Sequence, residues 1–214
     1  MASRTKPDRH GGHRWFAAMY DLVTRGSERS VLQHLRPLVA GGAAGQVLEI
    51  GVGTGANFPY YMEAAKIVAT DPNPFMLQRA KKRARDVGLA VEFHQCPAEA
   101  LPFANASFDT VISTLVLCSV SDQALTLAEI KRVLKPSGAF RFIEHVRADR
   151  SFTGQVQDFL TPVWRWFGAG CHLNRQTAAS IKGAGFEIVE LQQRRLVLMP
   201  VIVGAARSMS PQIR

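Results

Sequence analysis

Short apolar runs alternate with amphipathic stretches along most of the 214-residue chain. The apolar runs predict strands at 46–50, 66–70, 90–96, within 107–117, and at 139–146. Amphipathic stretches with suitable start and stop residues predict helices between them: one at 58–64, one from 74 that ends before Gly88, and one that is capped by Ser121 or Asp122 and stopped by 136–138. Strands separated by helices of this length form right-handed crossovers. The pattern therefore predicts a largely parallel sheet with helices on both faces.

The two ends of the chain depart from this alternation. Residues 15–39 predict one or two amphipathic helices, ended by Pro37 and the glycine-rich segment that follows. Residues 151–183 are helical and aromatic in pattern, and the stretches after them predict two strands that turn near Arg194 and pair as an antiparallel edge. We expect an α/β fold with a doubly wound, Rossmann-like sheet of seven strands and an N-terminal helical cap.

Length and composition indicate one domain. A chain with 47% hydrophobic residues can bury one core and is short for two. Within a single domain, 1–214, we expect a disordered basic tail at 1–14, a helical cap at 15–40, a cofactor-binding core at 41–150, an aromatic segment covering the substrate at 151–183, and C-terminal strands at 184–214. No window approaches 18 consecutive apolar residues, so the chain is expected to be cytoplasmic, without stable membrane insertion, although compatible with peripheral membrane contact.

Charge and cysteine spacing argue against two further classes of protein. The formal charge is +9, but the basic stretches carry no RNP, zinc-finger or helix-turn-helix pattern, so a solvated surface is favoured over a nucleic-acid partner. Cys96, Cys118 and Cys171 are widely spaced, with no CxxC pair and no histidine at zinc-finger spacing. We expect all three cysteines to pack, with no disulfide framework and no metal site.

The stretch VLEIGVGTG leads from the first predicted strand into three glycines at alternate positions, Gly51, Gly53 and Gly55. Glycine tolerates positive φ and leaves no Cβ in the way of a ligand. With Ala56 the loop fits the dinucleotide pattern GxGxxA, and by itself it fits GxGxG; Asp71 after the next strand suits the ribose in both cases. Glu49 favours the second pattern, because a carboxylate there attracts a sulfonium cation and repels a pyrophosphate.

Downstream motifs narrow this choice. The motifs LEIGVGTG, DPNP, AEALPF, SFDTVI and RVLKPSGAF occur in the order found in class I S-adenosylmethionine-dependent methyltransferases, which residues 46–146 resemble. Through TGANFPYY, DPNPFM, STLVLCSV, GAFRFIEHV and TPVWRWFGAGCHLNRQT, residues 47–190 are similar to the alkyl-thiol S-methyltransferases. The opening WFAAMYDLVTRGSER instead resembles the N-terminal helix of ubiquinone and menaquinone C-methyltransferases.

Two departures from these families matter. The animal thiol methyltransferases carry an N-terminal hydrophobic anchor, whereas the sequence here begins with a basic and polar stretch. Many class I enzymes also hold the adenine amino group with an aspartate where this chain has Pro97. We therefore expect adenine recognition to depend on backbone groups near Ala98 and Glu99.

The resemblance implies S-adenosylmethionine as the cofactor and S-adenosylhomocysteine as the product. It assigns the methionine end to Glu49, Gly51, Gly53, Gly55 and Asn57, the ribose to Asp71, the adenine pocket to Asn73 and Met76, and the floor beneath the sulfonium to Thr114 and Leu115. Turn or helix capping is the alternative role for the two asparagines, and core packing is the alternative for Met76.

The implied reaction is a direct in-line displacement, which needs orientation, exclusion of water and, for some acceptors, a base. A thiol is already a few per cent ionised near neutral pH, so a modest shift in its pKa suffices. His145 and His172 are the candidate bases, and a structural or surface role is their alternative. Because no covalent intermediate is needed, Cys118 and Cys171 are expected to pack.

Aromatic residues gather in two segments outside the common core: Trp15, Phe16, Tyr20, Phe152, Phe159, Trp164, Trp166 and Phe167. An aromatic lid predicts a small hydrophobic acceptor, and a core-facing stripe at helical spacing is the alternative. The leading hypothesis is methylation of a lipophilic thiol. Methylation at carbon, oxygen or nitrogen of a quinone, phenolic natural product or lipid amine stays open, as does a noncatalytic cofactor-binding protein. Nucleic-acid methylation is disfavoured, because no Asn/Asp-Pro-Pro-aromatic tetrad follows the fourth strand.

Overall fold

A seven-stranded sheet forms the centre of the protein. The structure, a computed structural model, describes residues 31–62, 66–148, 152–167, 171–196 and 199–209. The strand order is β3-β2-β1-β4-β5-β7-β6. The strands are β1 (Gln46–Ile50), β2 (Lys66–Thr70), β3 (Val91–His94), β4 (Phe108–Thr114), β5 (Leu134–His145), β6 (Phe186–Leu196) and β7 (Met199–Ser208). β1 to β5 pair in parallel, and β7 pairs antiparallel with both β5 and β6, which confirms the predicted sheet.

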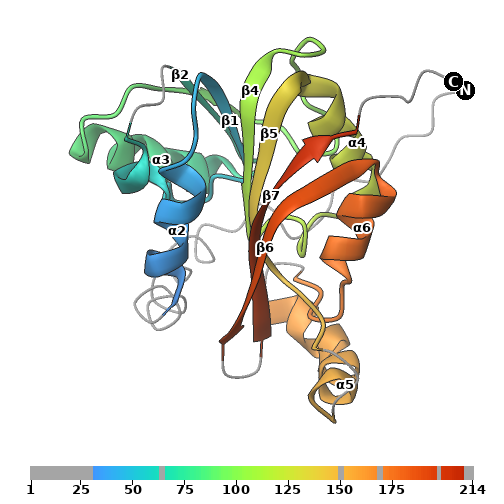
Figure 1. Cartoon of the computed structure of the whole chain (residues 1–214). Coiled ribbons are helices and arrows are strands. Elements are labelled where there is room, and N and C mark those ends of the chain that lie inside the picture. Colours follow the sequence, from blue (N-terminus) through green and yellow to red (C-terminus); the bar gives the residue numbers. More distant parts are fainter. Residues whose placement is uncertain (1–30, 63–65, 149–151, 168–170, 197–198, 210–214) are drawn as a thin grey trace, which may run out of the picture.

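Helices cover both faces of this sheet. In the described residues they are α2 (Gln33–Ala40), the short 3₁₀ helix η2 (Phe58–Tyr60), α3 (Pro74–Asp86), α4 (Gln123–Val133), α5 (Phe152–Phe167) and α6 (Thr177–Gly183). α2 and α3 lie on one side of the sheet and α4 and α6 on the other, while α5 extends beyond the lower end (Figure 1). This is the doubly wound arrangement that the alternation of strands and helices predicted.

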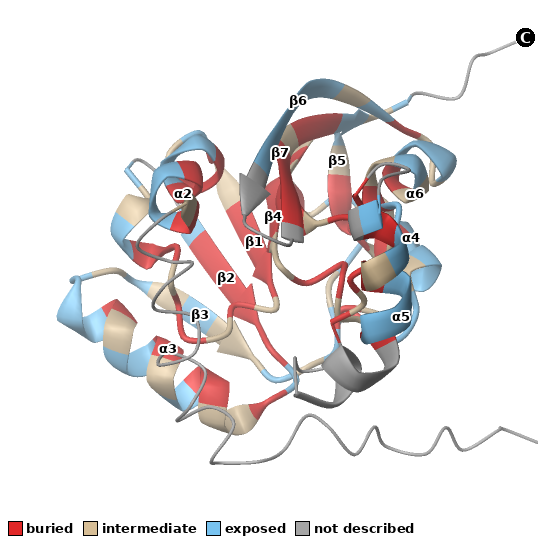
Figure 2. Ribbon diagram, turned by 90° about the horizontal axis from the view of Figure 1, so that it is seen from below, coloured by how far each residue is buried: buried red, intermediate tan, exposed pale blue. Residues whose placement is uncertain are grey.

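Alternate residues of the strands belong to two separate hydrophobic layers, one on each face of the sheet. Neighbouring residues of a strand point to opposite faces, so one set packs under α2 and the other under α4 and α6. The α2 layer includes Leu35, Val47, Ile112, Ile143 and Val203. The opposite layer includes Leu48, Val111, Ile130, Phe142 and Ile181. Viewed from below, the buried strands fill the centre and the exposed surfaces of the helices face outward (Figure 2).

Two helix starts agree with the sequence. The side-chain oxygen of Asn73 accepts hydrogen bonds from the backbone N–H groups of Phe75 (2.9 Å) and Met76 (3.4 Å), with Pro74 at the first turn of α3. Asp122, one of the two residues predicted to cap the next helix, accepts from the N–H of Leu125 at 2.9 Å. Asn73 therefore has the capping role that we named as its alternative.

Four predicted boundaries are wrong. Pro37 lies inside α2, because the buried packing of Leu35 and Val39 outweighs the loss of one backbone hydrogen bond. The helix predicted at 58–64 is only η2, after which Tyr61 is extended. β5 begins at Leu134 rather than near 139, since an irregularity in its pairing with β4 accommodates the Pro-Ser-Gly segment. β6 also continues beyond the turn predicted near Arg194.

Candidate active site

The glycine loop after β1 leaves space at one position. Gly51 and Gly53 both have φ of 56°, in the left-handed region. A Cβ at Gly51 would lie 2.5 Å from Val116, so that glycine lets the loop pack against the segment after β4. A Cβ at Gly53 would meet nothing within 4 Å. The small cleft beside the loop is also lined by Glu49 and Thr114, and the backbone at Gly53 is therefore accessible to a ligand.

Asp71 joins the glycine loop to the end of β2. Its side chain is buried, with one oxygen accepting from the N–H of Gly53 at 2.9 Å and the other from the N–H of Asn73 at 2.8 Å. Burial raises the pKa of Asp71, and the two N–H donors lower it in part. A carboxylate has about four lone-pair positions, so two remain for ribose hydroxyls. The predicted ribose contact is therefore compatible with the position of Asp71.

Glu49 belongs to a buried polar network under the cleft. Its two oxygens accept hydrogen bonds from the Asn57 amide at 2.9 Å and from the Tyr61 hydroxyl at 2.7 Å. The Asn57 amide also donates to the Thr114 hydroxyl at 3.0 Å, and its oxygen accepts from Arg36 at 2.7 Å. Burial raises the pKa of Glu49 to about 7, although the bonds from Tyr61 and Asn57 oppose this shift. A cation bound nearby would favour the ionised form.

Two members of this network, Arg36 and Tyr61, were missed by the sequence analysis. Arg36 occupies a position on the apolar stripe of α2, four residues after Leu32, and is 5% exposed. A charged residue on a buried stripe usually has a partner, so the signal was present in the sequence. Tyr61 had no comparable signal, because its side chain reaches Glu49 only where the chain becomes extended after η2.

The segment after β4 is held in a strained shape against β5. Leu115 has φ of 59°, which is uncommon for a leucine, and its N–H donates to the carbonyl of Ile143 at 2.7 Å. The buried carboxylate of Glu144 accepts from the Ser113 hydroxyl and from the N–H of Val116. Burial raises the pKa of Glu144, and these donors oppose the shift. β5 thus shapes the segment that follows β4.

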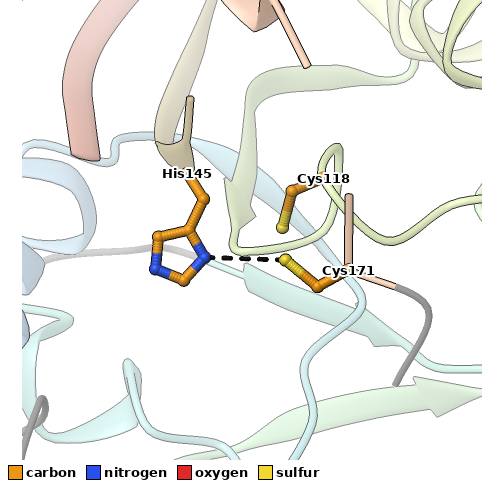
Figure 3. Close-up of side chains that lie close together, drawn as sticks. All are labelled: Cys118, His145 and Cys171. Carbon is orange, nitrogen blue, oxygen red and sulfur yellow. Dashed lines mark hydrogen bonds between the residues drawn. The ribbon is translucent and has the colours of Figure 1, made fainter. Parts of the chain in front are cut away.

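Cys118, His145 and Cys171 meet at this end of the sheet. Each offers one ligand atom, and the three atoms lie within 4.8 Å of one another. Figure 3 shows the two thiols and the imidazole converging, with Nδ1 of His145 3.8 Å from Sγ of Cys171. Cys118 and Cys171 are 1% and 6% exposed. The sequence analysis treated the cysteines as separate packing residues, because 26 or more positions separate each member from the next.

The remaining predicted site residues, on the histidine and adenine sides, lie outside the networks of Glu49 and Asp71. Nδ1 of His172 lies 3.3 Å from the carbonyl oxygen of Cys118. On the adenine side, Met76 and Ala98 are buried, while the Glu99 carboxylate accepts from the N–H groups that precede α4. The roles predicted for these residues toward a ligand stay predictions.

The predicted aromatic lid is only partly described by the structure. Trp15, Phe16 and Tyr20 lie outside the described residues. Trp164, Trp166 and Phe167 belong to α5, but their side chains also lie outside them. Phe152 and Phe159 are 81% and 82% exposed, so a core-facing stripe is wrong for Phe159.

α5 is fastened to the segment that follows β5. The N–H of Ala148 donates to the Gln157 side chain at 2.7 Å, and Arg147 pairs with Asp158 at 2.6 Å. The beginning of the helix therefore stays close to the carboxyl end of β5. None of the helices in the described residues combines the length and the apolar character needed to cross a membrane.

Comparisons with known proteins agree with this geometry. A family model described as a methyltransferase domain matches residues 48–142. The chain is 35% identical over 181 residues to thiol S-methyltransferase TMT1A of Homo sapiens, covering 83% of this chain and 74% of that protein. It is also 35% identical over 191 residues to the TMT1B protein of Homo sapiens, covering 84% and 78%.

Among solved structures, a SAM-dependent methyltransferase from Aquifex aeolicus has a similar fold. The TM-score is 0.61 at 18% identity, covering 91% of this chain and 98% of that chain. At this level of identity the likeness extends to the fold alone.

Proposed function

The chain belongs to the S-adenosylmethionine-dependent methyltransferases, in the family that includes the thiol S-methyltransferases, and from this premise we propose that its methyl acceptor is a small hydrophobic thiol. S-Adenosylmethionine is the cofactor and supplies, when bound, a methyl group already activated on a positively charged sulfur. The protein therefore has to bind the two reactants, orient them and exclude water.

This chain's residues fit the cofactor. The backbone at Gly53 is open, so a ligand can approach it closely. Asp71 has lone pairs left for ribose hydroxyls, and the Glu49 carboxylate lies where it can attract the cationic methionine end. Asn57 keeps Glu49 oriented, because it bonds both to that carboxylate and to Thr114. We assign cofactor binding to these residues.

One observation carries the proposed acceptor. Thr114 lines the cofactor cleft, and the next residue, Leu115, packs against the buried cluster of Cys118, Cys171 and Leu173. The cleft for the methyl donor is therefore adjacent to a buried, apolar and sulfur-rich cluster at the end of β4. Such a cluster suits a hydrophobic acceptor, and the names of the two human relatives support a thiol.

A thiol acceptor also needs little chemical activation by the protein. Its thiolate is strongly nucleophilic and is present at a few per cent near neutral pH, so an in-line attack on the methyl carbon needs no covalent intermediate. We propose that the 15–40 and 151–183 segments cover the acceptor and keep water out. His145 and His172 remain the candidate groups for receiving the thiol proton.

The test is a methyl-transfer assay with labelled S-adenosylmethionine and a panel of alkyl thiols, quinones, phenols and amines. We expect label in the thiols, together with release of S-adenosylhomocysteine. The Asp71→Asn variant serves as the control, since its weaker cofactor binding should make transfer much slower at the same, subsaturating cofactor concentration. Activity confined to the acceptors that are not thiols would contradict the proposal and favour carbon, oxygen or nitrogen methylation.

A further inference from the structure

We propose that Cys118, His145 and Cys171 form a three-ligand Zn²⁺ site, and that the fourth coordination position binds the acceptor thiol as its thiolate. The metal site stands on geometry alone. The role of the fourth position rests on the proposed function. The spacing of the three ligands along the chain does not indicate a metal site, because they come from segments that only the fold brings together.

The side-chain geometry is close to that of a zinc site. In tetrahedral coordination, bonds of about 2.3 Å to sulfur and 2.0 Å to nitrogen place two sulfurs about 3.8 Å apart and sulfur and nitrogen about 3.5 Å apart. Here Nδ1 of His145 lies 3.8 Å from Sγ of Cys171, and Sγ of Cys118 completes a group whose members all lie within 4.8 Å. Figure 3 shows all three side chains pointing toward one another. The ligand atoms would need to approach by about 1 Å at most to coordinate one ion.

The backbone holds these ligands in place. The carboxylate of Glu144, the neighbour of His145, accepts from the N–H of Cys118 at 3.2 Å, which fixes Cys118 relative to β5. The N–H of His172, beside Cys171, donates to the carbonyl of Cys118 at 2.7 Å. Such supporting bonds orient the ligands of metal sites and limit the reorganisation that binding requires.

A second set of bonds ties the Cys171 segment to both neighbours. The guanidinium of Arg175 donates to the carbonyl of Val120 at 2.7 Å, beyond Cys118 in the chain. The carbonyl of Arg175 accepts from the N–H of Arg147 at 3.0 Å, beyond His145. All three ligand-bearing segments are therefore joined by hydrogen bonds close to the ligands themselves.

The donor set favours zinc over a hard cation. Two thiolates and an imidazole are ligands for Zn²⁺, whereas Mg²⁺ and Ca²⁺ require oxygen. Two thiolates would also neutralise the charge of the ion in this buried place. Within the described part of the chain, no other Cys, His, Asp or Glu joins the group. Zinc sites with three protein ligands keep a fourth position for a water or a substrate.

That fourth position would activate the acceptor. A thiol that coordinates zinc loses its proton and stays nucleophilic as a thiolate. The proton goes to solvent, because a zinc-bound His145 has no free ring nitrogen to accept it and no longer serves as the candidate base. Its sulfur lone pair forms the new bond to the methyl carbon, while the bond from that carbon to the sulfonium sulfur breaks and its electron pair stays on the departing sulfur. The product thioether is neutral and a weak ligand, so it leaves the metal.

The first experiment measures zinc in the purified full-length protein under a non-coordinating reductant. We expect about one zinc per chain in the wild type. Cys118→Ser and Cys171→Ser should each lose it, whereas Cys96→Ser, which changes the third cysteine outside the group, should keep it. Circular dichroism melting of each variant separates loss of the ligand from loss of the fold, and Cys171→Ser provides a second test if Cys118→Ser does not fold.

Replacing zinc by Co²⁺ reports on geometry without any methyl transfer. We expect the visible absorption of a tetrahedral cobalt site and a thiolate-to-cobalt charge-transfer band. An alkanethiol added without S-adenosylmethionine should strengthen this band, because a third thiolate enters the fourth position. Cys96→Ser should respond as the wild type does.

The possible negative results distinguish the zinc site, the role of its fourth position and the proposed function. The site is overturned by wild-type protein without stoichiometric metal, by ligand variants that both keep as much zinc as the wild type, or by a Cys118–Cys171 disulfide in place of the metal. Metal-free protein that methylates thiols at an undiminished rate overturns the role of zinc and leaves the proposed function intact. A zinc-loaded protein that binds S-adenosylmethionine but methylates no thiol overturns the proposed function and the role of the fourth position.

Discussion

Two buried glutamates at the same end of the sheet have different kinds of partner. Glu49, in β1, accepts hydrogen bonds from the side chains of Asn57 and Tyr61. Glu144, in β5, accepts from the Ser113 hydroxyl and, unlike Glu49, also from backbone N–H groups of the segment after β4, those of Val116 and Cys118 among them. Both carboxylates are almost fully buried, and burial raises the pKa of each. Glu49 lies beside the ligand cleft, whereas Glu144 holds the backbone of the segment after β4 in its shape.

The surroundings of the two glutamates differ in the same way. The Glu49 side is rich in oxygen and nitrogen, and its members lie close together between 49 and 73, apart from Arg36 and Thr114. The Glu144 side presents two thiols and an imidazole from three distant segments. We infer a division in which β1 and β2 hold the methyl donor and β4 and β5 hold the acceptor.

The largest expected effect comes from Asp71→Asn, which removes one acceptor oxygen on the donor side. The new amide would direct its N–H groups at the N–H of Gly53 or of Asn73, so one of these two hydrogen bonds is lost, although Val52 of the loop still donates to the carbonyl of Thr70 in β2 at 2.8 Å. We expect cofactor affinity to fall at least about 100-fold, or about 2.7 kcal/mol, by calorimetry with S-adenosylmethionine and S-adenosylhomocysteine.

The matched control for that change is Asp109→Asn. Asp109 also accepts a backbone N–H, that of Gln46 at 2.9 Å, but at the start of β1, away from the loop. Its variant should bind the cofactor as the wild type does. Wild-type affinity in Asp71→Asn would show that the ribose site lies elsewhere.

Next in size is Glu144→Gln, which acts on the acceptor side. The recorded partners of the Glu144 carboxylate are all hydrogen-bond donors. The amide N–H₂ of glutamine would face one of these donors and leave it without an acceptor, so we expect the free energy of unfolding to fall by about 2 kcal/mol. Denaturant unfolding measures this loss. Cofactor affinity should stay within about twofold of the wild type, because the donor side is untouched. A fall in affinity as large as that in Asp71→Asn would mean that the two halves of the site are not separable.

Glu49→Gln should lower affinity for S-adenosylmethionine about tenfold at pH 8, since a neutral amide replaces a carboxylate beside a cation. Wild-type affinity should rise between pH 6 and pH 8 as Glu49, with its pKa of about 7, ionises. The variant should lack this rise. Calorimetry at several pH values tests the difference, and equal slopes in both proteins would argue against contact between Glu49 and the cation.

The same variant has a second, opposite consequence for stability without cofactor. The pKa of Glu49 is raised in the folded protein from its ordinary 4.5 to about 7, so its contribution to stability is present below about 4.5 and is lost as pH rises through about 7. Glutamine has no such dependence. Between pH 5 and pH 8 we therefore expect Glu49→Gln to gain about 2.5 kcal/mol in unfolding free energy relative to the wild type, since one pKa unit corresponds to about 1.36 kcal/mol.

The smallest effect is expected for Phe159→Ser, on the outer surface of α5. A side chain that is 82% exposed buries little apolar area, so the unfolding free energy should change by less than about 0.5 kcal/mol. Urea unfolding of the variant and the wild type side by side measures this. A loss of 2 kcal/mol or more would show that Phe159 packs against the rest of the chain in solution.

The glycine loop and Asp71 could be placed closely from the sequence, and the Glu144 side of the site much less so. Gly51, Gly53 and Asp71 belong to one strand–loop–strand unit, where local pattern and spacing carry the information. Asn73 was assigned to adenine, and its capping of α3 was named as the alternative that the structure shows. Arg36 reaches the same network from another helix and was missed, although its place on an apolar stripe was visible.

By itself, the sequence determined the order of strands and helices, the doubly wound sheet and the place of the glycine loop, because hydrophobic periodicity and glycine spacing act over short distances along the chain. Only the tertiary structure decided that β5 extends back to Leu134 and that Cys118, His145 and Cys171 meet. Contacts between segments 26 or more residues apart depend on how strands pair and how loops are hydrogen-bonded across the sheet, and no local pattern records them.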